Sequence, residues 1–174
     1  GTVVTWGNNA SGQLGDGTTT QRTSPVQVPG LTGMKALAAG FAYTVALKAD
    51  GTVWAWGKNA NGQLGNGTTT DSTVPVQVSG MFNVLAIAAG NDHTVALRND
   101  LTVITVWTWG NNANGQLGNG TMANSNAPVQ VGGLPSVTAV AAGYDHTAVL
   151  ANDGTVWAWG NNIHGQLGDG TTVQ

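Results

Sequence analysis

The 174-residue chain carries little charge: five Lys and Arg against eight Asp and no Glu give a formal net charge of −3, which excludes the basic surface that nucleic-acid-binding proteins present to phosphates. An apolar fraction of 41% and seven tryptophans exclude a disordered chain and predict one domain with a buried core. The absence of cysteine excludes disulfides and thiolate metal sites, and no apolar run is long enough to span a membrane.

A Trp-Gly segment recurs four times along the chain. Its tryptophans lie 50, 53 and 50 residues apart, at Trp6, Trp56, Trp109 and Trp159. A fixed period of this size is typical of propellers, solenoids and other arrays. The sequence therefore predicts a single repeat array over residues 1–174, with units at approximately 1–50, 51–103 and 104–153 and a partial unit at 154–174.

The first predicted strand of each unit is β-branched and aromatic and carries the repeated tryptophan. It spans Thr2 to Trp6 in the first unit and recurs at 52–56, 105–109 and 155–159. A loop rich in Asn and Gly follows, in which a single leucine, Leu14 in the first unit, is expected to pack onto the sheet. The second predicted strand begins with proline, which lacks an N–H for the ladder and therefore favours an outer edge. Its copies lie at 25–28, 75–78 and 128–131.

The third predicted strand, Met34 to Ala39, ends in Ala-Ala-Gly, and these small residues predict a close approach of neighbouring sheets. The fourth, Tyr43 to Lys48, leads through Asp50-Gly51 into the next tryptophan strand, and Asp-Gly between two strands is a strong hairpin signal. The third, fourth and following first strands should therefore form an antiparallel meander. No segment has a sustained period of 3.6 residues, so no substantial helix is expected.

One connection departs from the repeat. Between Asp100 and Thr105 the chain is three residues longer than at the equivalent Asp-Gly turn, and it is apolar at Leu101, Val103 and Ile104. Two interpretations are open. The insertion is either a longer hairpin at a variable rim or an apolar contact element, since these side chains at a loop tip would otherwise meet water.

The combined motifs resemble the repeat of the regulator of chromosome condensation family. They are Trp-Gly-x-Asn-x-x-Gly-Gln-Leu-Gly, then Pro-Val-x-Val, then Ala-Ala-Gly-x-x-His-Thr-x-Ala-Leu, and the match runs through essentially all 174 residues. The resemblance implies an all-β fold, a β-propeller of four-stranded antiparallel blades with seven blades in a complete ring. This chain would supply about three to three and a half blades, half of a ring. The first-described member of the family is a nucleotide exchange factor for a small GTPase, and other members bind proteins, inhibit enzymes or have no assigned role.

The turn between the third and fourth strands carries the candidate site. In the family this turn lies on the face with which the exchange factor grips its GTPase, so the resemblance implies a partner-binding rim here. The residues of this rim are Phe41, Tyr43, Asn91, Asp92, His93, Tyr144, Asp145 and His146. The apolar insertion, with Leu101, Val103 and Ile104, is a second candidate surface. In the alternative interpretation each histidine bonds a neighbouring loop and orders its blade, as expected of a side chain that recurs in successive repeats.

No catalytic, cofactor or metal site is predicted. The two Asp-His pairs lie on separate blades and do not supply converging metal ligands, and the other acids lie mostly at turns. No nucleophile context brings Ser, His and Asp together. The pair Trp54 and Trp56 shares one strand face, which suits packing between blades or, alternatively, a sugar platform.

These observations favour a non-enzymatic protein–protein interaction module without a cofactor. The alternative is a structural repeat protein that self-assembles into oligomeric rings or cell-surface structures, because open blade edges expose unpaired backbone groups. We expect a protein partner and self-association, and neither nucleic acid nor membrane as partner. The scarcity of charge with abundant Asn, Thr and Gly favours a secreted or cell-surface bacterial protein.

Overall fold

The computed structural model describes residues 1–173, which form thirteen β-strands and no helix. Among these residues there is accordingly no helix that could span a membrane. The strands form four antiparallel sheets that follow one another along the chain. The first sheet holds β1 (Thr2–Gly7) and β2 (Arg22–Thr32). The second holds β3 (Met34–Ala39), β4 (Tyr43–Lys48), β5 (Val53–Gly57) and β6 (Ser72–Gln77).

The third sheet repeats the second with slightly longer strands, and the fourth ends at its tryptophan strand. The third sheet holds β7 (Val84–Ala89), β8 (His93–Asn99), β9 (Ile104–Gly110) and β10 (Ser125–Gln130). The fourth holds β11 (Val137–Ala142), β12 (His146–Ala151) and β13 (Val156–Gly160). The chain is thus all-β and forms a partial β-propeller of about three blades, as the sequence predicts.

Each complete sheet is a meander in which neighbours in sequence are neighbours in space, in the order β3-β4-β5-β6 and β7-β8-β9-β10. The turn at Asp50-Gly51 joins β4 to β5, and Gly51 adopts a φ of 83°, which a glycine reaches without steric cost. Because the hairpin crosses the boundary between two sequence units, each sheet takes its first two strands from one unit and its last two from the next.

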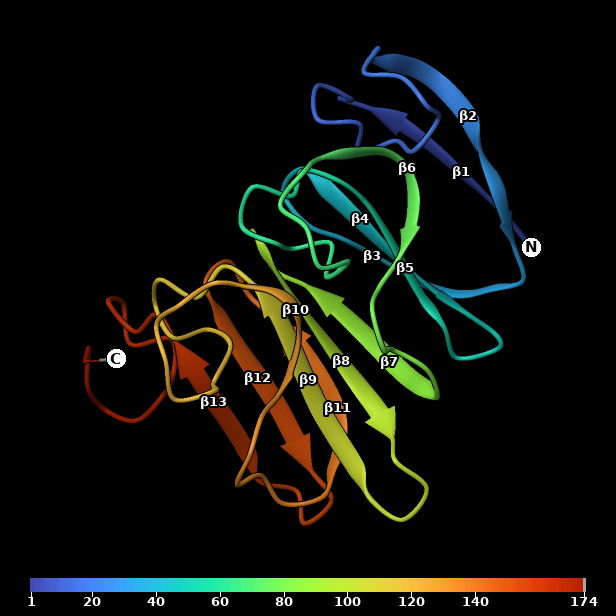
Figure 1. Ribbon diagram of the computed structural model, residues 1–174. Helices are drawn as coiled ribbons and strands as arrows, with labels where there is room; N and C mark the ends of the chain where they lie inside the picture. The colour runs from blue at the N-terminus through green and yellow to red at the C-terminus, as the bar shows by residue number, and fades with distance from the viewer. Residues whose placement is uncertain (174) are drawn as a thin grey trace.

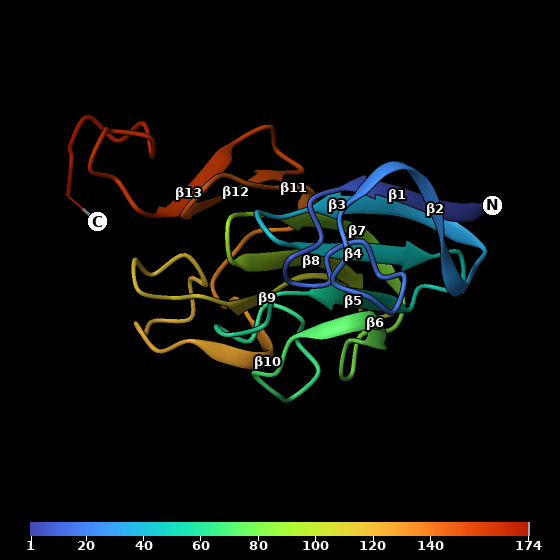
Figure 2. The ribbon, with the colours of Figure 1, turned by 90° about the horizontal axis from the view of Figure 1, so that it is seen from above.

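The sheets fan out in chain order, with the first and the fourth at opposite ends (Figure 1). The inner strands β3, β7 and β11 gather on one side of the molecule and the outer strands β6 and β10 lie on the other (Figure 2). Small residues on the inner strands allow this close approach, as the Ala-Ala-Gly pattern predicts. Three apolar clusters fill the spaces between successive sheets.

The repeated tryptophans hold successive sheets together. Trp56 and Trp109 are fully buried, each in a cluster with the preceding sheet, which confirms their predicted packing between blades. The indole N–H of Trp56 donates to the carbonyl of Gln13 at 2.9 Å, and that of Trp159 donates to Gln116 at 3.0 Å. Trp6, on the first sheet, is 61% exposed.

A buried asparagine in each loop is a feature that the sequence pattern did not single out. The side chain of Asn59 is fully buried; its carbonyl accepts from the N–H of Leu64 at 2.9 Å, and its amide donates to the carbonyls of Thr68 and Thr70 at 3.0 Å each. The same bonds recur in the other units around Asn9, Asn112 and Asn162. This asparagine fixes the loop, and the leucine beside it packs down as predicted, fully buried at Leu64.

The proline strands begin three residues earlier than predicted, since β6 starts at Ser72 and Pro75 lies inside it. The ladder between β5 and β6 has a register shift between Ala55 and Gly57, so the strand bends near the proline. Because β6 is the outermost strand, Pro75 removes no hydrogen bond to a further strand, and the predicted edge position is confirmed.

Candidate partner-binding face

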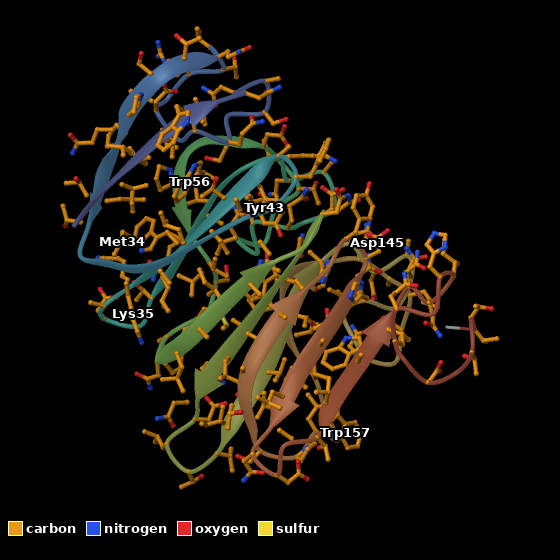
Figure 3. The ribbon with its side chains drawn as sticks, turned by 180° about the vertical axis from the view of Figure 1, so that it is seen from behind. Met34, Lys35, Tyr43, Trp56, Asp145 and Trp157 are labelled. Atoms are coloured by element: carbon orange, nitrogen blue, oxygen red, sulfur yellow. The ribbon has the colours of Figure 1, made fainter. Side chains whose placement is uncertain are left out.

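The two ends of the sheets form two faces of different character. The end of the sheets at which the tryptophan strands finish is called the upper face. It is formed by residues 8–21, 40–42, 58–71, 90–92, 111–124, 143–145 and 161–173. We call the lower face the opposite end, formed by 29–33, 49–52, 79–83, 100–103, 132–136 and 152–155. Tyr43 and Asp145 lie near the upper face, and Met34 and Lys35 near the lower one (Figure 3). The predicted rim residues are therefore on the upper face and the apolar insertion is on the lower face.

Three of the predicted rim residues are buried, Tyr43, Asp92 and His93, and the two rings among them link neighbouring sheets. The hydroxyl of Tyr43 donates to the backbone carbonyl of His93 in the next sheet. The Nε2 atom of His93 lies 3.0 Å from the hydroxyl of Thr147 in the sheet after that. Both side chains are almost completely inaccessible to solvent, so neither ring contributes to the exposed surface of the upper face. Both contacts cross from one sheet to the next, although the partner of His93 is a strand residue and not the loop that the alternative interpretation expected.

Each of these rings also covers the last glycine of Ala-Ala-Gly. A Cβ atom on Gly90 would overlap the imidazole of His93, and one on Gly143 would overlap that of His146. His146 is half-buried in the fourth sheet, in the same position over its glycine. The glycine therefore gives the ring room to lie flat against the turn, which explains why Gly precedes the aromatic position by three residues.

Three rim residues, one from each turn, form an arc in which Phe41 and Tyr144 are exposed and Asn91 is half-buried. The N–H of Phe41 donates to the carbonyl of Asn91 at 3.2 Å, and the N–H of Asn91 donates to that of Tyr144 at 3.0 Å. Phe41 is 75% exposed and Tyr144 69%, and the two side chains border a depression of about 360 Å³ floored by alanines and glycines. Backbone hydrogen bonds thus join the three turns, and two of these turns carry aromatic rings that are exposed on the upper face.

The two carboxylates of the rim differ in their surroundings. Asp92 is buried and accepts from the amide of Gln63 at 2.7 Å, from Lys58 Nζ at 3.1 Å and from Asn91 at 3.0 Å. Asp145 is half-buried, and its contacts with the amides of Asn114 and Gln116 are long, 3.3 and 3.4 Å. Burial, together with the negative charge of Asp92, raises the pKa of the Asp145 carboxyl.

The apolar insertion forms the tip of the hairpin between β8 and β9. The N–H of Asp100 donates to the carbonyl of Val103 at 2.9 Å, and Leu101 adopts a φ of 70°, which residues other than glycine rarely adopt. Leu101 is 89% exposed and Val103 is also exposed, whereas Ile104 packs against the cluster between the third and fourth sheets. The longer hairpin is present, and a contact role for its tip stays a prediction.

Sequence reasoning missed Lys58 and Gln63, which hold Asp92 from the preceding sheet. Lys58 follows Trp-Gly at a position that is Asn8, Asn111 and Asn161 in the other units, and this departure from the repeat was a signal. Within residues 1–173 no three His or Asp side chains gather in a group that could hold a metal ion.

Comparisons with known proteins agree with this architecture. The family profile of the RCC1-like domain matches residues 1–174. The ultraviolet-B receptor UVR8 of Arabidopsis thaliana is 34% identical over 156 residues, which cover 87% of this chain and 36% of UVR8. The crystal structure of human WBSCR16 superposes with a TM-score of 0.84 at 26% identity, over 98% of this chain and 45% of that one.

Two solved structures of yeast RCC1, named Prp20, are similar as well. That of Prp20p from Saccharomyces cerevisiae, described with its binding properties to Gsp1p and histones, has a TM-score of 0.85 at 25% identity and covers 98% of this chain and 44% of that one. The complex of yeast RCC1 with Kap60 has a TM-score of 0.83 at 25% identity and covers all of this chain and 43% of the relative. The chain therefore spans less than half the length of these relatives. With the repeat, the blades and the profile in agreement over its whole length, this chain belongs to the RCC1-like domain family.

Proposed function

We propose that this chain is a non-enzymatic protein-interaction module whose partner binds the upper face. The observation that carries the proposal is the arc of Phe41, Asn91 and Tyr144, which holds two exposed aromatic rings on a rigid backbone frame. Exposed aromatic side chains are enriched at protein interfaces, because each contributes a large contact area at a small cost in side-chain entropy. Turns positioned by a rigid sheet are also the usual place for binding residues.

The relatives support a protein partner. Yeast RCC1 forms a complex with Kap60, and the study of Prp20p describes its binding to Gsp1p and histones. Those partners belong to those proteins, and only the use of this fold to bind protein is proposed here. The hydrogen bonds of the aspartates support a non-enzymatic role. Four carboxylates each accept a hydrogen bond from the hydroxyl of the Thr two residues further on, and these bonds stabilise turns. The four carboxylates are those of Asp16, Asp50, Asp153 and Asp169.

Affinity capture tests the proposal. The 174-residue chain is immobilised, an extract of its source organism is passed over it, and the proteins retained are quantified by mass spectrometry. We expect a partner to be retained by the parent and lost with the double variant Phe41→Ala/Tyr144→Ala. Leu101→Ala is the matched control, because it removes an exposed apolar side chain from the lower face. Retention by the double variant, or loss with Leu101→Ala alone, would move the binding surface away from the upper face.

As a second candidate function we propose self-association, in which this chain supplies about half of a seven-bladed ring. The supporting observation is that the outermost sheets display surfaces that internal sheets bury. Leu150 and Val156 are exposed on the fourth sheet, whereas their counterparts Leu47 and Val53 are fully buried in the cluster that contains Trp109 of the next sheet. Trp6 of a second copy would cover Leu150 and Val156 in the same way.

A further inference from the structure

The net charge of the chain is concentrated on one face. The upper face and the strand ends beside it carry five carboxylates and two cations, Asp16, Asp71, Asp92, Asp145 and Asp169 with Arg22 and Lys58. The lower face and its strand ends carry three of each sign, Asp50, Asp100 and Asp153 with Lys35, Lys48 and Arg98. The whole formal charge of −3 therefore falls on the upper face. A face of one sign attracts a partner of the other sign and favours its approach.

Within this face the repeat pairs one carboxylate with a lysine and leaves its counterpart without a Lys or Arg partner. Lys58 pairs with Asp92 at 3.1 Å across the step from the second to the third sheet. One repeat further along, the position of Lys58 is Asn111 and the position of Asp92 is Asp145. Among residues 1–173 no Lys or Arg forms an ion pair with Asp145.

An exposed aromatic ring stands beside this carboxylate. Tyr144 precedes Asp145 in the same turn and, with Phe41, borders the depression of about 360 Å³. The face of an aromatic ring attracts a guanidinium or ammonium group within about 6 Å of its centre. Asp145 is not one of the residues that line the depression; it follows Tyr144 in the turn at its edge. An exposed aromatic ring and a carboxylate on successive residues are groups that bind a cationic side chain.

We infer that the depression bordered by Phe41, Asn91 and Tyr144, with Asp145 at its side, binds an Arg- or Lys-containing segment of the partner protein. The inference rests on the proposed function and specifies its partner by charge. In this inference the cation lies against the ring of Tyr144 and pairs with Asp145, and the rest of the segment crosses the depression toward Phe41.

The electrostatics of the free protein point the same way. Burial, and next the negative charge of Asp92, disfavour the ionised form of Asp145 and outweigh the opposing effect of His146, which is why the pKa of this carboxyl is raised. A cation from the partner would stabilise that ionised form and would take the role that Lys58 has beside Asp92. A neutral or acidic segment would leave the repulsion between the two carboxylates in place.

The test uses a capped, unstructured peptide of Gly, Ser and Arg as the probe, with the same peptide carrying Gln in place of Arg as its neutral counterpart. Binding to the 174-residue chain is measured by calorimetry or fluorescence anisotropy at low and high ionic strength. The repeat itself provides one variant, Asn111→Lys, which places a cation beside Asp145 as Lys58 stands beside Asp92. Asp145→Asn and Tyr144→Ala remove the two proposed contacts. Asp153→Asn removes an equal charge from the lower face and serves as the matched control.

We expect the Arg peptide to bind, the Gln peptide not to bind, and added salt to weaken the complex. Asp145→Asn and Asn111→Lys should each weaken binding by about tenfold or more, as expected for the loss of one charge-assisted contact, and Asp153→Asn should leave it unchanged. Equal binding of the two peptides, unchanged binding by Asp145→Asn, or equal weakening by Asp153→Asn would overturn the inference.

The capture experiment separates this inference from the proposed function. If the partner is lost with Phe41→Ala/Tyr144→Ala but retained by Asp145→Asn and at high salt, the protein-interaction function holds and the cationic segment is wrong. If the partner is retained by the double variant, the proposed function itself fails.

Discussion

The indole N–H of Trp109 donates a 2.9 Å hydrogen bond to the backbone carbonyl of Gln63 in the preceding sheet. The hydroxyl of Thr94 donates to the same carbonyl at 3.0 Å. Equivalent pairs converge on Gln13 and Gln116, so one carbonyl in each of the first three loops receives two donors from the next sheet. Successive blades are therefore joined by a repeated polar contact at the edge of each apolar cluster.

The buried tryptophans should dominate the stability of the stack. Trp109→Ala or Trp56→Ala removes a fully buried ring and its hydrogen bond, and each should lower the free energy of unfolding by about 3–5 kcal/mol in a urea titration. Trp6→Ala, at the exposed counterpart, should change it by less than about 0.5 kcal/mol in a monomeric sample. A loss at Trp6 as large as at Trp109 would contradict the packing described here.

Two glycines of one loop allow the cost of a steric clash to be measured apart from the cost of backbone strain. A Cβ on Gly65 would lie 2.7 Å from Trp109 Nε1, whereas a Cβ on Gly67 would have no atom within 4 Å; both residues have positive φ. Gly67→Ala should cost about 1–2 kcal/mol from the left-handed backbone alone. Gly65→Ala should cost clearly more, because the ring of Trp109 must move, and urea unfolding of the two variants measures the difference. Equal losses would mean that the ring yields freely.

Protonation of His93 should lower the free energy of unfolding in mild acid relative to its value at neutral pH. Burial, and next the nearby His146, lower the pKa of His93 from 6.5 to about 4. Between these values the unfolded chain binds a proton that the folded chain does not, so stability from this group is complete above about pH 6.5 and is lost as the pH falls toward 4. The loss amounts to roughly 3 kcal/mol, measured from urea midpoints across this range.

His93→Tyr is the matched variant, because Tyr43 occupies the equivalent position in the second sheet and folds over its own glycine. The variant should fold, and its free energy of unfolding should fall much less than that of the parent between pH 6.5 and 4. The same slope in the variant and the parent would assign the titration to other groups.

Self-association should depend on the exposed ends of the stack. The four sheets hold thirteen strands, so two copies supply twenty-six, two fewer than seven four-stranded blades require. We therefore expect the copies to touch through the faces of their outer sheets and not to close a perfect ring. In this contact Trp6 of one copy lies against Leu150 and Val156 of another. Light scattering should show a mass that rises with concentration in the parent and falls to the monomer with Leu150→Asp. A monomer at every concentration would rule this association out.

The sequence was sufficient to predict the strands and their order in the blades, but not to predict which side chains of the rim are exposed. The Asp50-Gly51 turn and the β-branched and aromatic residues of the tryptophan strand are local signals, and they predicted the meander of β3, β4 and β5 correctly. The Asp-His turn was ambiguous, because whether His93 meets water depends on Thr147 in another sheet, 54 residues away. The replacement of His by Tyr43 in the first unit was the available hint, since both are rings with a polar atom at the tip.

The link between Lys58 and Asp92 was beyond local reasoning for a similar reason. The two residues are 34 positions apart, and they meet because the loop after β5 leans across to the next sheet. Only the stacking of the blades determines that step, so the carboxylate without a cation, Asp145, could be recognised once the stack was known.

The central claim, that a protein partner binds the upper face, is tested most directly by hydrogen exchange of the chain with and without the captured partner. The account predicts new protection at residues 40–42, 90–92 and 143–145, with little change at the hairpin tip 100–103 or on β1 and β13. Protection confined to residues 100–103, or to the two outermost sheets, would contradict it and would assign the partner to the lower face or to the ends of the stack.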